Sequence, residues 1–400
     1  MEALDAIALE RQSMSDSWWR GKEQLDNDQK KVITLPEDKS YLVTGPPGSG
    51  KTNLLMLRAN FLFLADRTNI LVIVFTRTLK EFIASAGAKY DFPESKIVTS
   101  RRWQQEFLRE HGVSFDDAPN EFDASRKYFL ERIQSVIDRK KLENQYDAIF
   151  LDEAQDYLPE EIIVFRKLAK VLFCVADHRQ KLYQGDDAIP VIQSIVDDTI
   201  SLKYHYRNGL CICKVADAIA KHNDSYIPLA ETSHYDATTY PPSVDYRRCG
   251  SLDEQIDVVL EKLDVQLSAY PENLLGVISP TIASTNAIWN RLSSSRFAAA
   301  SMLQLGRDRE PFDGRKSVCV ATFAAAKGLE FRALHMVGCD ELKSFSHNRN
   351  MAFTGVTRAK TSLSLYSSAD IHGYLQSALD SLRPIGDLPD LDDVFRVRRK

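Results

Sequence analysis

The fold of this chain is decided by the stretch Gly45-Pro46-Pro47-Gly48-Ser49-Gly50-Lys51-Thr52. It matches the pattern G-x-x-x-x-G-K-[ST], in which backbone N–H groups of a glycine-rich loop surround phosphate oxygens. The flanks are the required ones, because the apolar run 41–44 precedes the loop and the helix-prone run 53–58 follows it. We therefore expect a buried strand, a phosphate-binding loop and a helix N-terminus in succession.

The chemistry of a phosphate loop gives each of its residues a role. The positive end of the helix dipole adds to the attraction for an anion. Lys51 would reach the β- and γ-phosphates of ATP, and the Thr52 hydroxyl would be a ligand of Mg²⁺. The residues expected to surround the phosphates are Gly45, Pro46, Pro47, Gly48, Ser49 and Gly50.

Two acids follow a second apolar run. The run 149–151 ends directly before Asp152 and Glu153. Asp152 can hold Mg²⁺ through water, and Glu153 can orient and deprotonate an attacking water. An isolated Asp-Glu pair is often a solvated strand end, but its position behind an apolar strand and downstream of the phosphate loop favours the catalytic interpretation.

Short apolar runs alternate with helix-prone stretches along the chain. This alternation predicts a doubly wound α/β fold with parallel sheets, since strands buried on both faces are apolar throughout. We expect the charged segment 104–145 to be a small helical insertion and the segment 223–249 to be irregular. The predicted strands are 41–44, 70–75, 148–151, 171–175, 275–279, 318–322, 334–337 and 362–366.

Composition limits the partners. The chain of 400 residues is long enough for two domains. Its net charge is −5, so the chain lacks the overall basic character that is typical of nucleic-acid binders. Any binding of nucleic acid must therefore come from local basic patches. Neither a secretory signal nor an apolar run that could span a membrane is evident, and we expect a cytoplasmic protein with no membrane partner. The six cysteines are expected to be reduced core residues.

The acids belong to the string Asp152-Glu153-Ala154-Gln155-Asp156, which resembles motif II of the UvrD/Rep-type superfamily 1A DNA helicases. Further strings resemble the other motifs of that family, in the same order along residues 25–367. They are Gln29 (Q motif), Phe75-Thr76-Arg77 (Ia), Thr99 with Arg101 and Arg102 (Ib), Asp177 to Tyr183 (III), Tyr204-His205-Tyr206-Arg207 (IV), Thr322 with Ala326-Lys327-Gly328-Leu329-Glu330-Phe331 (V) and Gly355-Val356-Thr357-Arg358-Ala359-Lys360 (VI).

The resemblance implies two RecA-like P-loop NTPase domains, 1–200 and 201–400, with ATP and Mg²⁺ bound between them. Gln29 would recognise adenine, Tyr206 would stack on it, and Glu330 would contact the ribose. Gln180 would sense the γ-phosphate, and Arg207 and Arg358 would act as arginine fingers. The residues implied to contact single-stranded DNA are Phe75, Thr76, Thr99, Arg101, Arg102 and Tyr183. For Phe75 and Tyr183 the alternative is ordinary core packing, and for Arg101 and Arg102 it is a solvated surface.

Three departures from the family pattern bear on function. The helical insertion of the first domain is small, and only 296–316 remains where the family carries a large second insertion. Gly185 replaces a tryptophan of motif III, and Ala324 replaces a histidine of motif V. Two hypotheses follow. The chain is a 3′→5′ DNA helicase or translocase, or it is a DNA-responsive ATPase subunit that partners a nuclease, as in bacterial antiviral pairs of the Gabija type.

Overall fold

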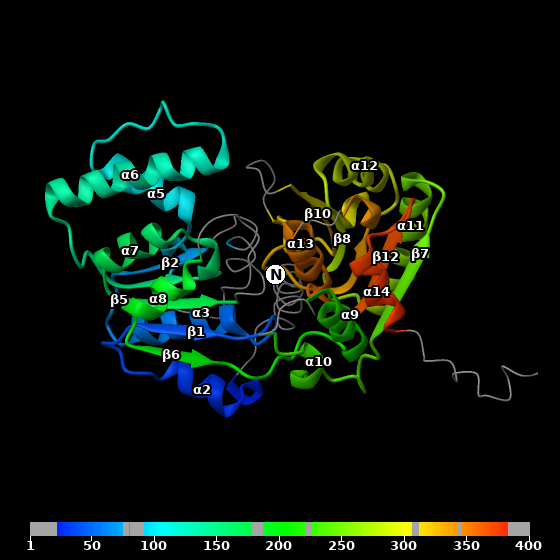
Figure 1. The fold of residues 1–400 in the computed structure, drawn as a ribbon, viewed down its shortest axis with the longest axis horizontal. Helices are drawn as coiled ribbons and strands as arrows, with labels where there is room; N and C mark the ends of the chain where they lie inside the picture. Colours follow the sequence, from blue (N-terminus) through cyan, green and yellow to red (C-terminus); the bar gives the residue numbers. More distant parts are fainter. Residues whose placement is uncertain are drawn as a thin grey trace, which may run out of the picture.

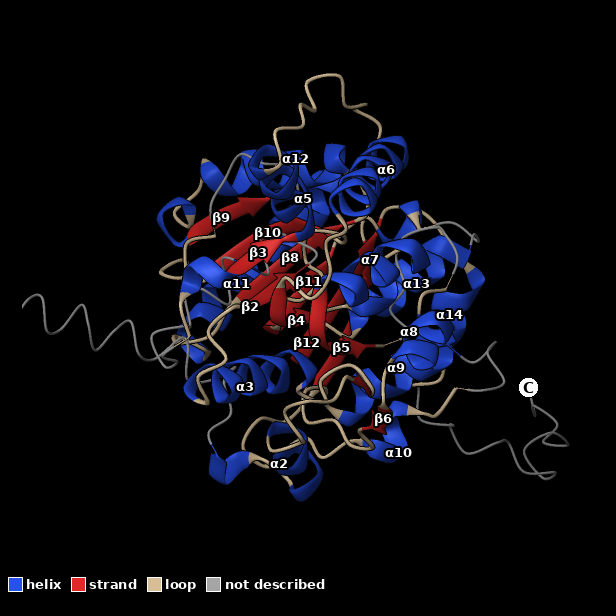
Figure 2. Ribbon diagram, turned by 90° about the vertical axis from the view of Figure 1, so that its left-hand side faces the viewer, coloured by secondary structure: helices blue, strands red, loops and turns tan. Residues whose placement is uncertain are grey.

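Two six-stranded parallel sheets form the centre of the protein. The computed structural model describes residues 22–74, 80, 92–177, 187–220, 226–305, 312–342 and 346–382. Figure 1 shows two lobes, one coloured from blue to green and one from green to red, and Figure 2 shows strands surrounded by helices. We call the lobes the first and the second domain. The predicted α/β class with two RecA-like domains is confirmed.

The first sheet has the strand order β3-β2-β4-β5-β1-β6. All of its neighbouring strands pair in parallel. The four inner strands carry apolar side chains on both faces, and both faces are covered by helices. Its strands are β1 (Tyr41–Thr44), β2 (Ile70–Val74), β3 (Ile97–Thr99), β4 (Tyr146–Leu151), β5 (Ala169–Ala176) and β6 (Asp198–Ser201).

The second sheet has the order β7-β12-β11-β8-β10-β9 and is also parallel throughout. Phe331 of β11 packs against Gly276 of β8, where an added Cβ atom would stand 2.6 Å from its ring. The strands are β7 (Ser243–Arg248), β8 (Leu275–Ser279), β9 (Ser301–Gln304), β10 (Val318–Thr322), β11 (Phe331–Met336) and β12 (Ala359–Ser367).

Helices of the first domain connect its strands and cover its sheet. Helix α2 is held against α3 by the buried Arg58, which donates to the carbonyl oxygens of Ile33 (2.9 Å) and Pro36 (2.8 Å). Along the chain, helices α5 and α6 follow β3 and precede β4, at the place of the predicted insertion. They lie at the top of the first domain in Figure 1. The helices are η1 (Lys22–Gln24), α2 (Asn27–Ile33), α3 (Lys51–Leu64), η3 (Glu94–Lys96), α5 (Ser100–Glu110), α6 (Phe122–Lys140), η4 (Ala154–Asp156), α7 (Pro159–Leu168) and α8 (Ile189–Ile195).

The second domain is built in the same way. Helices α9, α13 and α14 pack together in one hydrophobic cluster on the sheet, and α11 and α12 carry another. The helices are α9 (Leu210–Ala220), α10 (Leu229–Thr232), α11 (Leu252–Ala269), α12 (Ile282–Ser293), η6 (Ala298–Ala300), η7 (Cys339–Glu341), α13 (Ser346–Val356) and α14 (Gly373–Asp380).

Some details differ from the sequence predictions. The segment 223–249, expected to be irregular, contains α10 and β7 among its described residues, so that prediction is wrong for these stretches. All six cysteines are free as expected; Cys211 is half-buried and the other five are buried. Within the described ranges, none of the helices has both the length and the apolar character that crossing a membrane requires.

Candidate active site

The glycine-rich loop joins β1 to α3 and takes its shape from two glycines. Gly48 and Gly50 adopt φ angles of 77° and 84°, in the left-handed region that favours glycine. A Cβ atom on Gly48 would stand only 2.4 Å from the Cβ atom of Arg207, in the segment that follows β6. The absence of a side chain at Gly48 therefore lets this segment approach the phosphate loop closely.

Lys51 begins α3 and points back over the loop. Its Nζ donates to the carbonyl oxygens of Gly45 (2.8 Å) and Pro46 (2.9 Å). The carboxylate of Asp177, directly after β5, lies 4.0 Å from the same ammonium group. A cation is thus held beside the loop backbone, as a site for phosphate requires.

Thr52 and Asp152 bring oxygen atoms together from α3 and the end of β4. The Thr52 hydroxyl lies 3.3 and 3.1 Å from the two carboxylate oxygens of Asp152. Burial, followed by the charge of Glu153, raises the pKa of Asp152 to about 7. These residues fit Mg²⁺, because it prefers oxygen ligands and its charge would stabilise the ionised form of this buried carboxylate.

Glu153 has an unusual backbone conformation for a side chain of its size. Its φ and ψ angles of 49° and 46° lie in the left-handed region, which typically costs about 1–2 kcal/mol for a non-glycine residue. Gln155 fixes the carboxylate by donating to Oε2 at 2.6 Å, and its own carbonyl oxygen accepts the backbone N–H of Asp177 at 3.0 Å. Strain of this kind is characteristic of active sites.

A lysine of the second domain reaches Glu153 and the nearby Asp156. Lys327, in the β10–β11 loop, is buried; its Nζ lies 2.5 Å from the Asp156 carboxylate and 3.6 Å from that of Glu153. Burial alone would raise the pKa of Glu153, but the charges of Lys327, Arg358 and Lys51 lower it below its usual value. Glu153 is therefore ionised, as a general base must be.

In the second domain, cationic side chains surround the carboxylate of Glu330, opposite the phosphate loop. Arg207 donates from Nε to Glu330 Oε1 at 2.8 Å and also pairs with it through Nη2, and Lys360 lies 3.3 Å from Oε2. Arg358 is buried and donates to the Thr354 carbonyl oxygen at 3.2 Å. Burial, followed by repulsion from Arg207, lowers the pKa of Arg358 to about 10, so this arginine stays charged.

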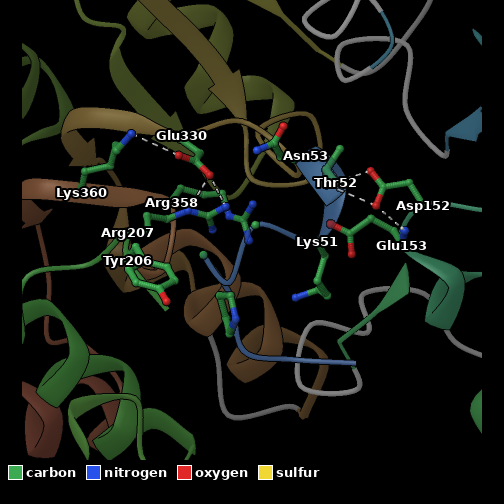
Figure 3. Close-up of a pocket in the computed structure, with 14 residues that line it drawn as sticks. Lys51, Thr52, Asn53, Asp152, Glu153, Tyr206, Arg207, Glu330, Arg358 and Lys360 are labelled. Atoms are coloured by element: carbon green, nitrogen blue, oxygen red, sulfur yellow. Dashed lines mark hydrogen bonds and ion pairs between the residues drawn. The ribbon is translucent and has the colours of Figure 1, made fainter. Parts of the chain in front are cut away.

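Residues of both walls line one pocket between the two domains (Figure 3). Figure 3 places Lys51, Thr52, Asp152 and Glu153 on one side, with Arg207, Glu330 and Lys360 on the other. The lining residues are Pro47, Gly48, Gly50, Lys51, Thr52, Asn53, Asp152, Glu153, Tyr206, Arg207, Gly328, Glu330, Arg358 and Lys360.

Residues predicted to read the base lie beside the loop. The Gln29 amide donates to the Ser49 carbonyl oxygen (2.9 Å) and accepts from the Asp26 N–H (3.1 Å). Tyr206 donates its hydroxyl hydrogen to the Asp26 carboxylate, and its backbone N–H donates to the Gly48 carbonyl oxygen at 3.1 Å. The assignment of Gln29 and Tyr206 to adenine stays a prediction.

Three of the residues predicted to contact DNA are described. The Thr99 hydroxyl caps α5 by accepting the Arg102 N–H. The Arg101 guanidinium lies over the Phe129 ring, 4.3 Å from its centroid. Arg102 pairs with Glu106 at 2.7 Å on the exposed side of α5. Thr99 therefore has a local structural role, and Arg102 is the more accessible arginine.

The remaining predicted residues lie outside the described part of the chain. They are Phe75 and Thr76 of motif Ia, and Gln180 and Tyr183 of motif III. Their assignments stay predictions.

Several residues of the site have no role that the sequence alone predicts. Lys327 and Lys360 stand inside the strings matched to motifs V and VI, but nothing in those strings shows which acid each lysine would pair with. For Asn53 and Asp26, the only indication in the sequence is that they stand near Lys51 and Gln29 along the chain. Their places follow from packing between the domains.

Two family models match the chain. One, described as an AAA domain, covers residues 29–186, and the other, described as a UvrD-like helicase C-terminal domain, covers residues 317–366. The first contains Lys51, Asp152 and Glu153, and the second contains Arg358 and Lys360. The chain belongs to the UvrD/Rep-type superfamily 1 helicase family.

Solved structures of helicases also resemble this UvrD-like chain. The structure of the PRRSV helicase matches with a TM-score of 0.39 and 14% identity, over 85% of this chain and 54% of that one. The C-terminal domain of a possible DNA helicase from Lactobacillus plantarum WCFS1 matches with a TM-score of 0.31 and 20% identity, over 43% of this chain and 93% of that one. The UvrD-like chain thus spans about half the length of the PRRSV protein. No curated protein matches the sequence.

Proposed function

We propose that this UvrD-like protein hydrolyses ATP in the pocket between its two domains and couples hydrolysis to single-stranded DNA. The observation that carries the proposal is the division of the pocket: Lys51 and Glu153 line one wall, and Arg358 lines the other. An ATPase needs charge compensation for the γ-phosphate, a base for water and further cations in the transition state. The pocket has candidates for all three.

Each side chain has a role in this proposal. Lys51 compensates the charge of the β- and γ-phosphates, and Glu153 orients the attacking water and accepts its proton. Arg207 and Arg358 stabilise the negative charge that develops on the transferred phosphoryl group. Mg²⁺ would be held by Thr52 and Asp152 and would neutralise phosphate charge.

The position of the site supports the proposed coupling to DNA. Because the two walls belong to different domains, turnover depends on how the domains are held against each other, and a strand bound across both could change that arrangement. Arg102, exposed at the start of α5, supports contact with a phosphate backbone. The proposed 3′→5′ direction comes from the family resemblance. Gln180, with the other motif Ia and III residues, would link the nucleotide to the strand.

A second candidate function is a DNA-responsive ATPase subunit that regulates or partners a nuclease, as in bacterial antiviral defence. The reduced insertions favour it. Between α12 and β10 the described residues form only η6, the edge strand β9 and short connections. In the first domain the insertion consists of α5 and α6. The described part of these insertions thus offers little structure to engage a duplex, which processive unwinding would need.

Steady-state ATPase measurements with and without single-stranded DNA test the proposal. We expect the strand to raise kcat several-fold. A rate that DNA leaves unchanged would contradict the coupling. Strand displacement on duplexes with a 3′ or a 5′ tail separates the two candidates: unwinding of the 3′-tailed substrate by the purified chain supports a helicase, whereas stimulated hydrolysis without unwinding supports the subunit.

A further inference from the structure

Lys360 has a defined partner that the proposed catalytic roles do not use. It follows Arg358 at the start of β12, and its backbone carbonyl oxygen accepts the Gly209 N–H at 3.0 Å. The side chain lines the pocket and is mostly buried, with 15% of its surface exposed. Its ammonium lies 3.3 Å from Oε2 of Glu330, on the side of the carboxylate away from Arg207 (Figure 3).

Glu330 is therefore held at both oxygens by different cations. Arg207 takes Oε1 and Lys360 takes Oε2. Although burial raises its pKa, the charges of Arg207 and Lys360 lower the pKa of Glu330 to about 2. The pocket thus contains a carboxylate that is ionised at neutral pH on the wall opposite Lys51.

An ionised carboxylate can only accept hydrogen bonds. The triphosphate of ATP offers it no donor and repels it, whereas the hydroxyl groups of the ribose are good donors. The phosphates are expected at Lys51 and the base beside Tyr206, so the sugar lies between them. Glu330, which lines the same pocket, is suited to accept from a ribose hydroxyl.

One atom of Glu330 has to change partner for this to happen. Arg207 now engages Oε1, and its Nη1 also donates to the Thr357 carbonyl oxygen at 3.3 Å. If Arg207 turns to the γ-phosphate, as the proposed function requires, Oε1 becomes available to the sugar. Lys360 remains on Oε2, keeps the buried charge paired and prevents the side chain from turning away.

We propose that Lys360 is a positioning residue for ribose selection, which holds Glu330 by Oε2 so that Oε1 can accept a ribose hydroxyl when Arg207 engages the γ-phosphate. The inference rests on the proposed function, since it assumes that ATP binds in this pocket. It concerns recognition of the sugar and not the chemical step.

Calorimetric titration of the full chain tests this inference without turnover. The probes are the β,γ-imido analogues of ATP, 2′-deoxyATP and 3′-deoxyATP, titrated into the wild type, Lys360→Met and Lys360→Arg. We expect the wild type to bind the ribonucleotide about tenfold more tightly than at least one deoxy analogue, the effect typical of one hydrogen bond to a charged group. Lys360→Met should lose that preference, and Lys360→Arg should recover most of it.

The controls separate sugar recognition from damage to the fold. Lys316→Met changes a lysine of the same domain that does not line the pocket and should keep the wild-type preference. A structural defect in Lys360→Met would weaken the ribo and deoxy analogues equally and leave their ratio unchanged. An unchanged ratio in Lys360→Met, or no preference in the wild type, overturns the inference. Failure of the wild type to bind any analogue would instead overturn the proposed function.

Discussion

Lys327 of the second domain lies 3.6 Å from the carboxylate of Glu153 in the first. The same ammonium lies 2.5 Å from Asp156, and both acids follow β4. The contact connects the loop before β11 directly to the proposed catalytic base. The charge on one domain therefore influences the protonation of an acid on the other.

Removing this charge should alter the pH dependence of hydrolysis. Among the charges around Glu153, that of Lys327 lowers its pKa most. In Lys327→Met, burial would raise the pKa of Glu153, so the base would become protonated at a higher pH. We expect the acid limb of kcat against pH to move to higher pH. Lys170→Met, which loses only an exposed pair with Asp147, should keep the wild-type profile; equal profiles for all three proteins would contradict the prediction.

Gly48 should not tolerate a side chain, whereas Gly112 should. Both have a positive φ, of 77° and 70°, so alanine costs about 1 kcal/mol of backbone strain at either position. Only at Gly48 would the new Cβ atom collide with Arg207; at Gly112 nothing lies within 4 Å. We expect Gly48→Ala to lower kcat/KM for ATP by more than tenfold, and Gly112→Ala to leave it near the wild-type value. Comparable activity in the two variants would show that the close approach is unimportant.

Arg358→Ala should affect the chemical step more than binding. Removal of an arginine finger typically lowers the rate by about 10³-fold or more, because its contact matters mainly in the transition state. We expect a large fall in kcat with little change in ATP affinity, measured by single-turnover hydrolysis and by titration. A variant that loses affinity and keeps kcat would place Arg358 in ground-state binding.

The burial of His335 leads us to expect that the folded protein loses stability in acid. It contacts the Tyr366 hydroxyl (3.0 Å) and the Gln266 side chain (2.8 Å), and burial lowers its pKa to about 3. Between this value and the unfolded pKa of about 6.5, the unfolded chain binds one more proton at this residue. Its contribution to stability is thus fully present above about pH 6.5 and falls by up to about 1.4 kcal/mol per pH unit below it.

Denaturant unfolding at several pH values checks that contribution. His335→Gln should be less sensitive to acid than the wild type over this range. The exposed His372→Gln should follow the wild type, because its imidazole is open to solvent. The same acid sensitivity in His335→Gln and the wild type would contradict the assignment.

The sequence predicted eight of the twelve strands that the structure describes, and the four missed strands, β3, β6, β7 and β9, are the four sheet edges. The inner strands are apolar throughout because helices cover both faces. Edge strands lack that signal: β7 and β6 are mostly exposed, and β3 has only three residues. Their pairing is fixed by the neighbouring strand and not by their own composition.

The part of the candidate site that could be predicted from the sequence is the part whose residue types have a specific chemical use. Phosphate chemistry predicted the loop that contains Lys51, and metal and acid–base chemistry predicted the roles of Asp152 and Glu153. The structure brings these residues together in one pocket. Lys327 and Lys360 could not be assigned, because a lysine can pair with any acid and only the folded domains select Glu153 and Glu330. Arg101, chosen for its charge, lies over the Phe129 ring, an outcome that depends on how α6 packs on α5.

The most direct test of hydrolysis in the interdomain pocket compares the wild type with Glu153→Gln in the presence of Mg²⁺ and saturating single-stranded DNA. Steady-state turnover is measured beside equilibrium ATP binding. We predict that Glu153→Gln binds ATP with close to wild-type affinity but hydrolyses it at least a hundredfold more slowly, since loss of a general base typically costs about 10²–10⁴ in rate. Turnover at the wild-type rate in Glu153→Gln would contradict the assignment of the base and with it the proposed site of hydrolysis.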